Sequence, residues 1–358
     1  MVRNGSPRKS RAVAPLGSSG AIHREKGMRI GFNGPPLNYA AGIEIDAGSI
    51  RAVVLGHGRS DDHASPWLRV VRASHVSIPD GAMSGTDILE PRAVARAIVD
   101  AFGGADQLTR WSNAHLTLGL PPCAVLIRSV ALSDLTRHPW IDDVCGGRQV
   151  RCGRELGLDW FEERVLREAE CVMSLDRDAL CVDWFRCVAT DGSEHATIIA
   201  TTRQHVESRV EAAALSGLRV AIVDGNAEAA LRACRFWVQR RSAAETTYAV
   251  IWGGAAHVRI WCVHDQAVEM ALDGETDAHL QRLACWARER KPGVIVVALD
   301  DAACARSRFA TSGVASEIGC ETDRFSLGQC CAGLEPQTPA LRANGYAVAF
   351  GLALRGIQ

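Results

Sequence analysis

The sequence has no run of apolar residues long enough to cross a membrane. The longest candidate, YAVAFGLAL at 346–354, lies between Arg342 and Arg355 and falls short of the roughly 18 apolar residues that a span requires. Residues 1–27 are basic and rich in Ser and Gly, and they lack the apolar stretch of a secretory signal. We therefore expect no direct membrane span, no export, and a disordered basic tail over residues 1–40.

An excess of charge of either sign is also missing. The formal net charge is -1, with 40 Lys and Arg against 41 Asp and Glu, so the chain as a whole has no field to attract nucleic acid. The 47% hydrophobic and 23% charged fractions are typical of a globular protein. The balanced charge leads us to expect no nucleic-acid partner. At 358 residues the chain exceeds the usual size of a single core, so we expect two domains.

Sequence signatures of metal sites and of common catalytic sites are absent as well. The 13 cysteines include no C-x-x-C pair and sit mostly in apolar runs, which is typical of small buried side chains in a reducing cytoplasm. No His or Cys partners stand at zinc-type spacing, so we expect no metal site. G-x-S-x-G, P-loop and H-E-x-x-H motifs are also missing, which argues against the enzyme classes that these motifs define.

What the sequence does contain is a pattern that occurs twice. GIEIDAGSIRAVVLGHG at 42–58 predicts a strand, a tight turn of small residues and a second strand, and AVIWGGAAHVRIWCV at 249–263 has the same plan. Further strands and helices follow each copy, which indicates an internal repeat. An α/β pattern with this repeat predicts two similar domains with mixed sheets around a cleft.

The polar, charged segment 239–245 is the predicted boundary between the two halves. The irregular stretch at 133–155 looks like an inserted loop within the first half. The expected first domain is residues 41–238, with an inserted peptide-binding subdomain, and the C-terminal helix 339–358 completes it. The expected second domain, at 246–338, is more divergent.

Three parts of the chain carry a family resemblance. They are GIEIDAGSIRAVVL at 42–55, the segments that begin FEERVLREAEC at 161 and IIATTRQHVES at 198, and TPALRANGYAVAFGLALR at 338–355. With these residues the chain resembles the PilM-like proteins of type IV pilus assembly. The resemblance implies an α/β, actin-like fold, which is a ribonuclease H-like duplicated fold with two domains and mixed sheets around a cleft. It is weak between residues 250 and 335.

In an actin-like cleft, two hairpin turns hold the phosphates, and carboxylates beside them hold magnesium. The resemblance assigns nine residues to these turns: Glu44, Asp46, Ala47, Gly48, Ser49, Arg51, Gly253, Gly254 and Ala255. We interpret them as the remains of a nucleotide site, because Trp252 stands where the family has an acid. An indole has one N–H donor and no oxygen, so it cannot hold the metal.

Two further positions depart from the family pattern. The loop ALDDAACARSR at 298–308 lacks the family's glycines and places Asp300 and Asp301 near an anionic nucleotide. Asn226 stands where the family commonly has Glu, and we expect it to cap the following helix. The sequence therefore predicts no ATP hydrolysis and no cofactor, with binding of ATP and magnesium left as the alternative.

The resemblance implies a non-enzymatic, cytoplasmic scaffold in bacterial type IV pilus assembly, peripheral at the inner membrane. Its partners would be the cytoplasmic N-terminal peptide of a single-span inner-membrane pilus protein and other pilus assembly proteins. We expect the peptide groove in the first domain, and the candidate residues, which fit a plain core equally well, are Phe161, Val165, Leu166, Ile198 and Thr202. The alternatives are an actin-like ATPase or phosphotransferase with an unusual cleft, and the cytoplasmic arm of a type II secretion platform.

Overall fold

The structure of the chain is a computed structural model. It describes residues 38–58, 67–136, 158–188, 192–242, 245–254, 257–300, 303–304, 307, 318–331 and 344–357. Ala255, Asp301, most of the predicted tail and most of the predicted loop at 133–155 lie outside these ranges. Among the described residues, no helix is both long enough and apolar enough to cross a membrane.

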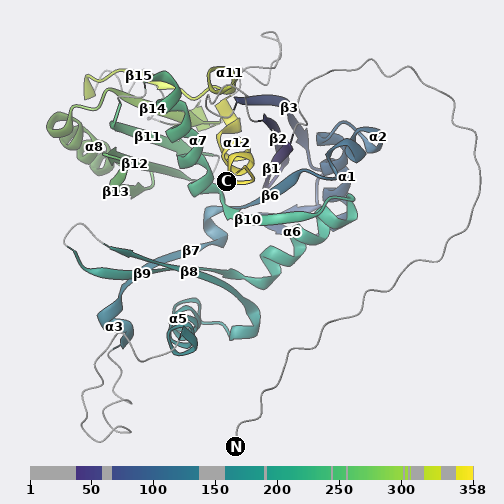
Figure 1. Cartoon of the computed structure of the whole chain (residues 1–358), viewed down its shortest axis with the longest axis horizontal. Helices are drawn as coiled ribbons and strands as arrows, with labels where there is room; N and C mark the ends of the chain where they lie inside the picture. Colours follow the sequence, from purple (N-terminus) through teal and green to yellow (C-terminus); the bar gives the residue numbers. More distant parts are fainter. Residues whose placement is uncertain are drawn as a thin grey trace, which may run out of the picture. The chain divides into compact units, whose positions relative to one another are not determined.

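The first half of the chain forms a five-stranded sheet with the order β10-β6-β1-β2-β3 (Figure 1). Its strands are β1 (Asn38–Asp46), β2 (Ser49–Gly58), β3 (Trp67–Ser77), β6 (His115–Leu120) and β10 (Val220–Gly225). β1, β2 and β3 pair antiparallel, whereas β6 pairs parallel with both β1 and β10. A two-residue turn at 47–48 closes the β1–β2 hairpin, as the small residues there predict.

The second half forms another five-stranded sheet with the order β13-β12-β11-β14-β15. Its strands are β11 (Thr247–Gly253), β12 (Val258–His264), β13 (Ala267–Asp273), β14 (Val294–Leu299) and β15 (Thr322–Arg324). Counted along the chain, their order and directions repeat those of the first sheet. The predicted α/β duplication with two mixed sheets is confirmed.

Helices fill the space between the sheets and cover their outer faces (Figure 1). α7 (Asn226–Arg241) and α12 (Ala347–Arg355) lie between the two sheets and share one core with side chains from both. The outer face of the first sheet packs against α1 (Pro91–Ala101) and α6 (Arg203–Leu215), and that of the second against α8 (Asp277–Arg290). The two sheets are thus joined by buried apolar surface, with the hairpins at one end of it.

Alternation along β1 explains how the hairpin is held. Ile43 and Ile45 point into the core beneath α1 and α6, so Gly42 and Glu44 point to the opposite face. A Cβ at Gly42 would collide with the backbone of α12, which means that only glycine lets the helix lie this close. Glu44 therefore emerges beside the start of α12, where the cleft begins.

The segment between β6 and α6 forms an inserted subdomain. Its antiparallel sheet has the order β7-β9-β8, from β7 (Leu126–Ala131), β9 (Glu194–Thr202) and β8 (Leu180–Val188). α3 (Leu132–Thr136) and α5 (Leu158–Met173) pack on one face of this sheet and enclose a separate small core. The other face is free of this core.

One predicted local feature is wrong. Asn226 does not cap α7, because Gly225 occupies the N-cap position in an extended conformation (φ -74°, ψ 138°) and no side chain caps the helix. Asn226 is instead a buried first residue of the helix, and its Oδ1 has no hydrogen-bond partner among the described residues. Thr202 does act as a cap, since its hydroxyl accepts a hydrogen bond from the His205 N–H of α6.

Candidate functional site

The cleft brings together residues from both predicted hairpins. Five of the nine predicted nucleotide-site residues line one cavity: Glu44, Asp46, Arg51, Gly253 and Gly254. Ala47 and Gly48 form the exposed turn, Ser49 starts β2 beside it, and none of the three lines the cavity. The cavity also includes Asn226, Trp252, His257 and Asp300. His257, which directly precedes β12, was missed because no motif in the sequence marks it as a cleft residue.

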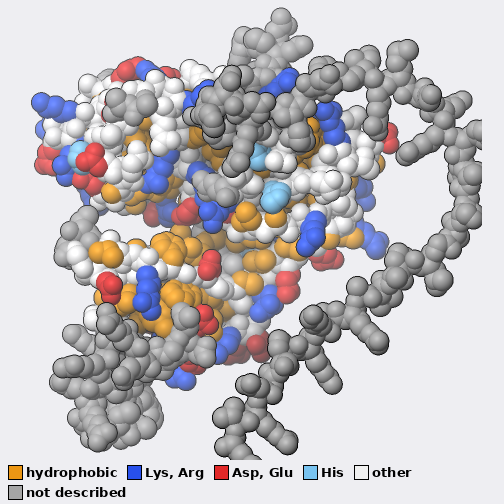
Figure 2. Space-filling model, viewed as in Figure 1, with side chains coloured by type: hydrophobic (Ala, Val, Ile, Leu, Met, Phe, Trp, Pro, Cys, Tyr) orange, Lys and Arg blue, Asp and Glu red, His pale blue; other side chains and the backbone are white. Residues whose placement is uncertain are grey.

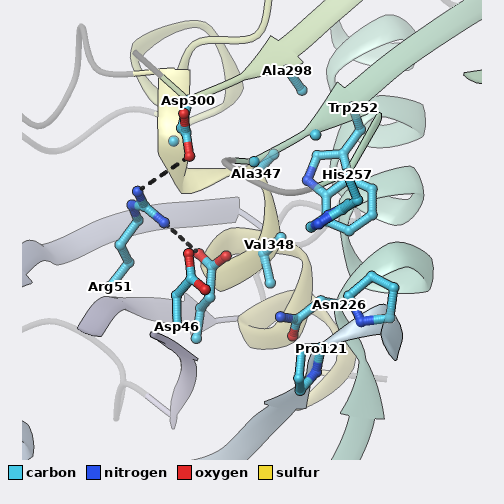
Figure 3. Close-up of a pocket in the computed structure, with 15 residues that line it drawn as sticks. Asp46, Arg51, Pro121, Asn226, Trp252, His257, Ala298, Asp300, Ala347 and Val348 are labelled. Carbon is cyan, nitrogen blue, oxygen red and sulfur yellow. Dashed lines mark ion pairs between the residues drawn. The ribbon is translucent and has the colours of Figure 1, made fainter. Parts of the chain in front are cut away.

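Arg51 lies between carboxylates that come from the two sheets (Figure 3). Its Nη1 is 3.5 Å from Oε2 of Glu44, its cross-strand partner, and its Nη2 is 3.9 Å from Oδ2 of Asp300, which follows β14. All three side chains are nearly buried, with 10% to 14% of their surface exposed. The guanidinium therefore occupies the centre of the cleft and compensates charge from both sides.

Burial has a large effect on Glu44. Desolvation raises the pKa of its carboxyl group to about 7, against the lowering effect of Arg51, and Asp46 adds to the rise. The pKa of Arg51 is also raised: burial lowers it, but the charges of Glu44, Asp300 and Asp46 outweigh burial. Arg51 thus stays charged throughout the physiological range, while Glu44 titrates near neutral pH.

Trp252 closes the other side of the cavity. It is 5% exposed, and its ring centroid lies 4.7 Å from that of His257 and 5.9 Å from that of Trp261. Burial also lowers the pKa of His257, which favours its neutral form. Trp252, which stands where the resemblance implies an acid, is therefore packed in the core that joins the two sheets.

The space that remains does not accommodate ATP with Mg²⁺, the ligands that an actin-like fold implies. The cavity holds about 30 Å³, which is room for roughly one or two water molecules, whereas small-molecule pockets typically reach about 300 Å³ or more. The side chains of Arg51, Trp252 and His257 enter the space from both hairpins (Figure 3). In this conformation the residues present do not fit a nucleotide.

A larger groove, of about 430 Å³, lies between the inserted subdomain and the first sheet. One wall is the face of the β7-β9-β8 sheet that α5 does not cover. The other wall comes from β10, the start of α7, Val206 of α6 and Arg355 at the end of α12. None of the groove residues comes from 250–335, the part of the chain where the family resemblance is weak.

The sheet wall of the groove is largely apolar. Ile127, Ile199 and Asp183 form one cross-strand row, and Phe185 and Thr201 flank it. Ile127 is 43% exposed and Phe185 is 51% exposed, although both are large apolar side chains. Figure 2 shows hydrophobic side chains gathered over this part of the molecule. Neighbouring exposed apolar side chains that line a groove are typical of an interaction site.

The opposite wall carries the ion pair of Arg232 with Asp224. Arg232 donates to Oδ2 of Asp224 at 2.9 Å and to the carbonyl oxygen of Gly351 at 2.9 Å, and it thereby ties α7 to β10 and α12. Burial raises the pKa of Glu228, which also lines this wall. An extended segment in the groove would therefore meet an apolar sheet face on one side and a fixed polar network on the other.

The five residues predicted for a peptide groove lie elsewhere. Phe161, Val165 and Ile198 are in the subdomain core, with 5%, 0% and 1% of their surface exposed, and Leu166 is half-buried on α5. Thr202 caps α6. Three of the five are therefore core residues, which is the alternative that the sequence left open. Their neighbours Ile199 and Thr201 point to the other face of β9, which lines the groove.

Comparison with known proteins supports the fold assignment. No protein-family model matches the sequence, and no curated protein matches it. Among solved structures, the chain is similar to one from a PilM–PilN type IV pilus biogenesis complex, with a TM-score of 0.62 and 16% identity. The alignment covers 89% of this chain and 98% of that one.

Weaker likenesses have TM-scores of 0.37 and 0.39, each at 11% identity. The first is to the cytoplasmic domain of EpsL, an inner membrane component of the type II secretion system of Vibrio cholerae, over 73% of this chain and 82% of that one. The second is to the ethanolamine utilization protein EutJ from Carboxydothermus hydrogenoformans, over 89% and 90%. Because the likeness to the pilus structure spans nearly the whole of both chains, the fold is the duplicated, two-domain actin-like fold predicted from the sequence.

Proposed function

We propose that the chain is a non-enzymatic cytoplasmic scaffold of a type IV pilus or a related secretion machine. In this proposal it binds the short cytoplasmic N-terminal peptide of a single-span inner-membrane protein in the groove between β10 and the inserted subdomain. The observation that carries the proposal is the exposed apolar face of the β7-β9-β8 sheet along a groove of about 430 Å³. The likeness of the chain's fold to a structure from a PilM–PilN complex supports a partner of this kind.

The chemistry of the groove suggests how such a peptide would bind. Ile127, Ile199 and Phe185 offer apolar surface for two or three apolar anchor residues of an extended segment. Asp183 interrupts this surface and favours a basic or hydrogen-bonding residue at the facing position of the peptide. Because Arg232 and Asp224 of the opposite wall already pair with each other, the peptide would gain affinity mainly from the sheet face.

The non-enzymatic part of the proposal rests on the cleft. An actin-like ATPase holds nucleotide and metal between its two hairpins. Here that space is filled by Trp252 and by Arg51 with its partners Glu44 and Asp300, which we call the Arg51 cluster. An ATPase with an unusual cleft remains the alternative to test, and it predicts that nucleotide changes the affinity for the peptide. The scaffold proposal predicts binding without any nucleotide.

Calorimetric titration with synthetic peptides tests the proposal. The peptides copy about ten to fifteen N-terminal residues of the single-span inner-membrane proteins encoded beside this chain. The test variant is Phe185→Asp in the groove, and its matched control is Leu215→Asp on α6, which is outside the groove and similarly exposed at 49% against 51%. One of the peptides should bind without ATP, and Phe185→Asp should weaken its binding by about 2 kcal/mol or more, because the peptide would desolvate an unpaired charge.

Three outcomes would contradict the proposal. The first is no heat with any of these peptides, which removes the scaffold function. The second is equal loss of affinity in Phe185→Asp and Leu215→Asp, which removes the groove. The third is binding that requires ATP, which favours the nucleotide-dependent alternative.

A further inference from the structure

Asp300 is held in place by its own backbone surroundings. Its Oδ1 accepts a hydrogen bond from the Ala303 N–H at 2.6 Å, and its own N–H donates to the carbonyl oxygen of Gly253 at 3.3 Å. These bonds fix the carboxylate at the end of β14, beside the second hairpin. The oxygen left over, Oδ2, is the one that lies 3.9 Å from Arg51.

Arg51 is fixed from two other directions. It stands opposite Glu44 in the β1–β2 ladder, and the two side chains are paired at 3.5 Å. Its guanidinium also lies against Gly345 just before α12, where an added Cβ would be 3.0 Å from Nε. One side chain therefore contacts the first hairpin, the loop after β14 and the segment that leads into α12.

We infer that Arg51 is a built-in cation that ties the first hairpin to Asp300 of the second sheet, so that the cleft end of the two joined halves stays closed without a nucleotide. The charge pattern supports this role. Glu44, Asp46 and Asp300 all line the cavity, and Arg51 is the cation that faces them among its described lining residues. Without Arg51, nearly buried carboxylates would face one another uncompensated, which costs far more than an exposed ion pair.

This inference does not depend on peptide binding in the groove. It explains why the cleft does not fit a nucleotide: the Arg51 side chain itself links the two sides of the cleft. The second hairpin provides a natural comparison. Arg259 is opposite Trp252 as Arg51 is opposite Glu44, but its guanidinium pairs with Asp273 of β13 in the same sheet. Arg259 therefore makes an Arg–Asp pair that does not cross the cleft.

Amide hydrogen exchange of the full chain tests the inference. The test variants are Arg51→Met, which keeps the apolar stem, and Asp300→Asn, which keeps the shape, and the control is Arg259→Met. Both test variants should speed exchange by about tenfold or more at 294–300 and 344–350, because opening of the cleft exposes both sides of it. Arg259→Met should affect β12 and β13 only.

The inference is overturned if Asp300→Asn, the milder change, leaves exchange at 344–350 as in the unsubstituted chain. It is also overturned if Arg259→Met speeds exchange at both cleft segments as much as Arg51→Met does. Added ATP with magnesium should leave both segments unchanged in the unsubstituted chain. Saturable protection by the nucleotide would show a cleft that opens to receive it, and would overturn the inference as well.

Discussion

Glu44 and Arg51 face each other across the first hairpin, and the pKa values of both are raised, although for different reasons. Desolvation penalises the charged form of each, so it raises the pKa of Glu44 and on its own would lower that of Arg51. Because Arg51 is surrounded by carboxylates, it keeps its charge. Glu44 shares Arg51 with Asp300, whose charge adds to the rise in the pKa of Glu44.

This imbalance makes the contribution of Glu44 to stability depend on pH. The folded-state pKa of about 7 is above the ordinary value of 4.5, so the folded protein holds the proton more tightly than the unfolded chain does. The Glu44 contribution is therefore fully present below about pH 4.5 and is lost as the pH rises through 7. The charged and titratable groups that face Glu44 in the cavity are Arg51, Asp46, Asp300 and His257.

Glu44→Gln should remove this dependence. Relative to the unsubstituted chain, the free energy of unfolding of the variant should rise by up to about 3 kcal/mol between pH 5 and pH 8, since each pKa unit corresponds to about 1.4 kcal/mol. Urea unfolding at the two pH values measures this difference. An equal change in the free energy of unfolding of both proteins would show that burial does not raise the pKa of Glu44.

Single residues also show where sequence reasoning stops. Glu44, Asp46 and Arg51 are close along one hairpin, and the repeat together with the family resemblance predicted that they share a cavity with Gly253 and Gly254. The Arg51–Asp300 pair could not be predicted, because it depends on the separation of two sheets across the cleft. Asn226 looked like a helix cap by residue type, but the chain reaches α7 one residue earlier, through an extended Gly225.

At the scale of elements, the choice of face on β9 was the largest uncertainty. Ile198 and Ile199 are adjacent isoleucines, so alternation alone cannot say which of them points into the core. The helix α5 decides it, because α5 packs over Ile198 and leaves Ile199 to the groove. The two hairpins predicted at 42–58 and 249–263 do form, as β1 with β2 and β11 with β12, because each copy has a turn of small residues between two apolar strands.

The position of α12 depends on glycine at its contact with α7. A Cβ at Gly351 would collide with the backbone of Ala229, although alanine is the better helix former by about 1 kcal/mol. We predict that Gly351→Ala lowers the free energy of unfolding by about 2 kcal/mol or more, because the two helices must move apart.

Gly48→Ala is the matched control, because nothing lies within 4 Å of its added Cβ. It should change the free energy of unfolding by no more than about 0.5 kcal/mol. Chemical denaturation of both variants measures the difference. A neutral or stabilising Gly351→Ala would show that α12 is not packed as closely on α7 as described.

At the scale of the whole molecule, duplication and insertion have produced two separate sites. The duplicated sheets form the cleft, which Trp252 and the Arg51 cluster fill. The insertion between β6 and α6 forms the groove, whose apolar wall stays exposed. In our account the ion pairs of Arg51 keep the cleft closed, and the groove binds the partner.

The most direct test of this account is photo-cross-linking in the cell that makes the protein. A photoreactive amino acid replaces Phe185 in the groove, or Leu215 on α6 as a control of similar exposure. We predict that position 185 cross-links to the cytoplasmic N-terminal segment of a single-span inner-membrane protein, and that position 215 does not. Cross-linking to that segment from position 215 alone, or from neither position, would contradict the assignment of the groove as the partner site.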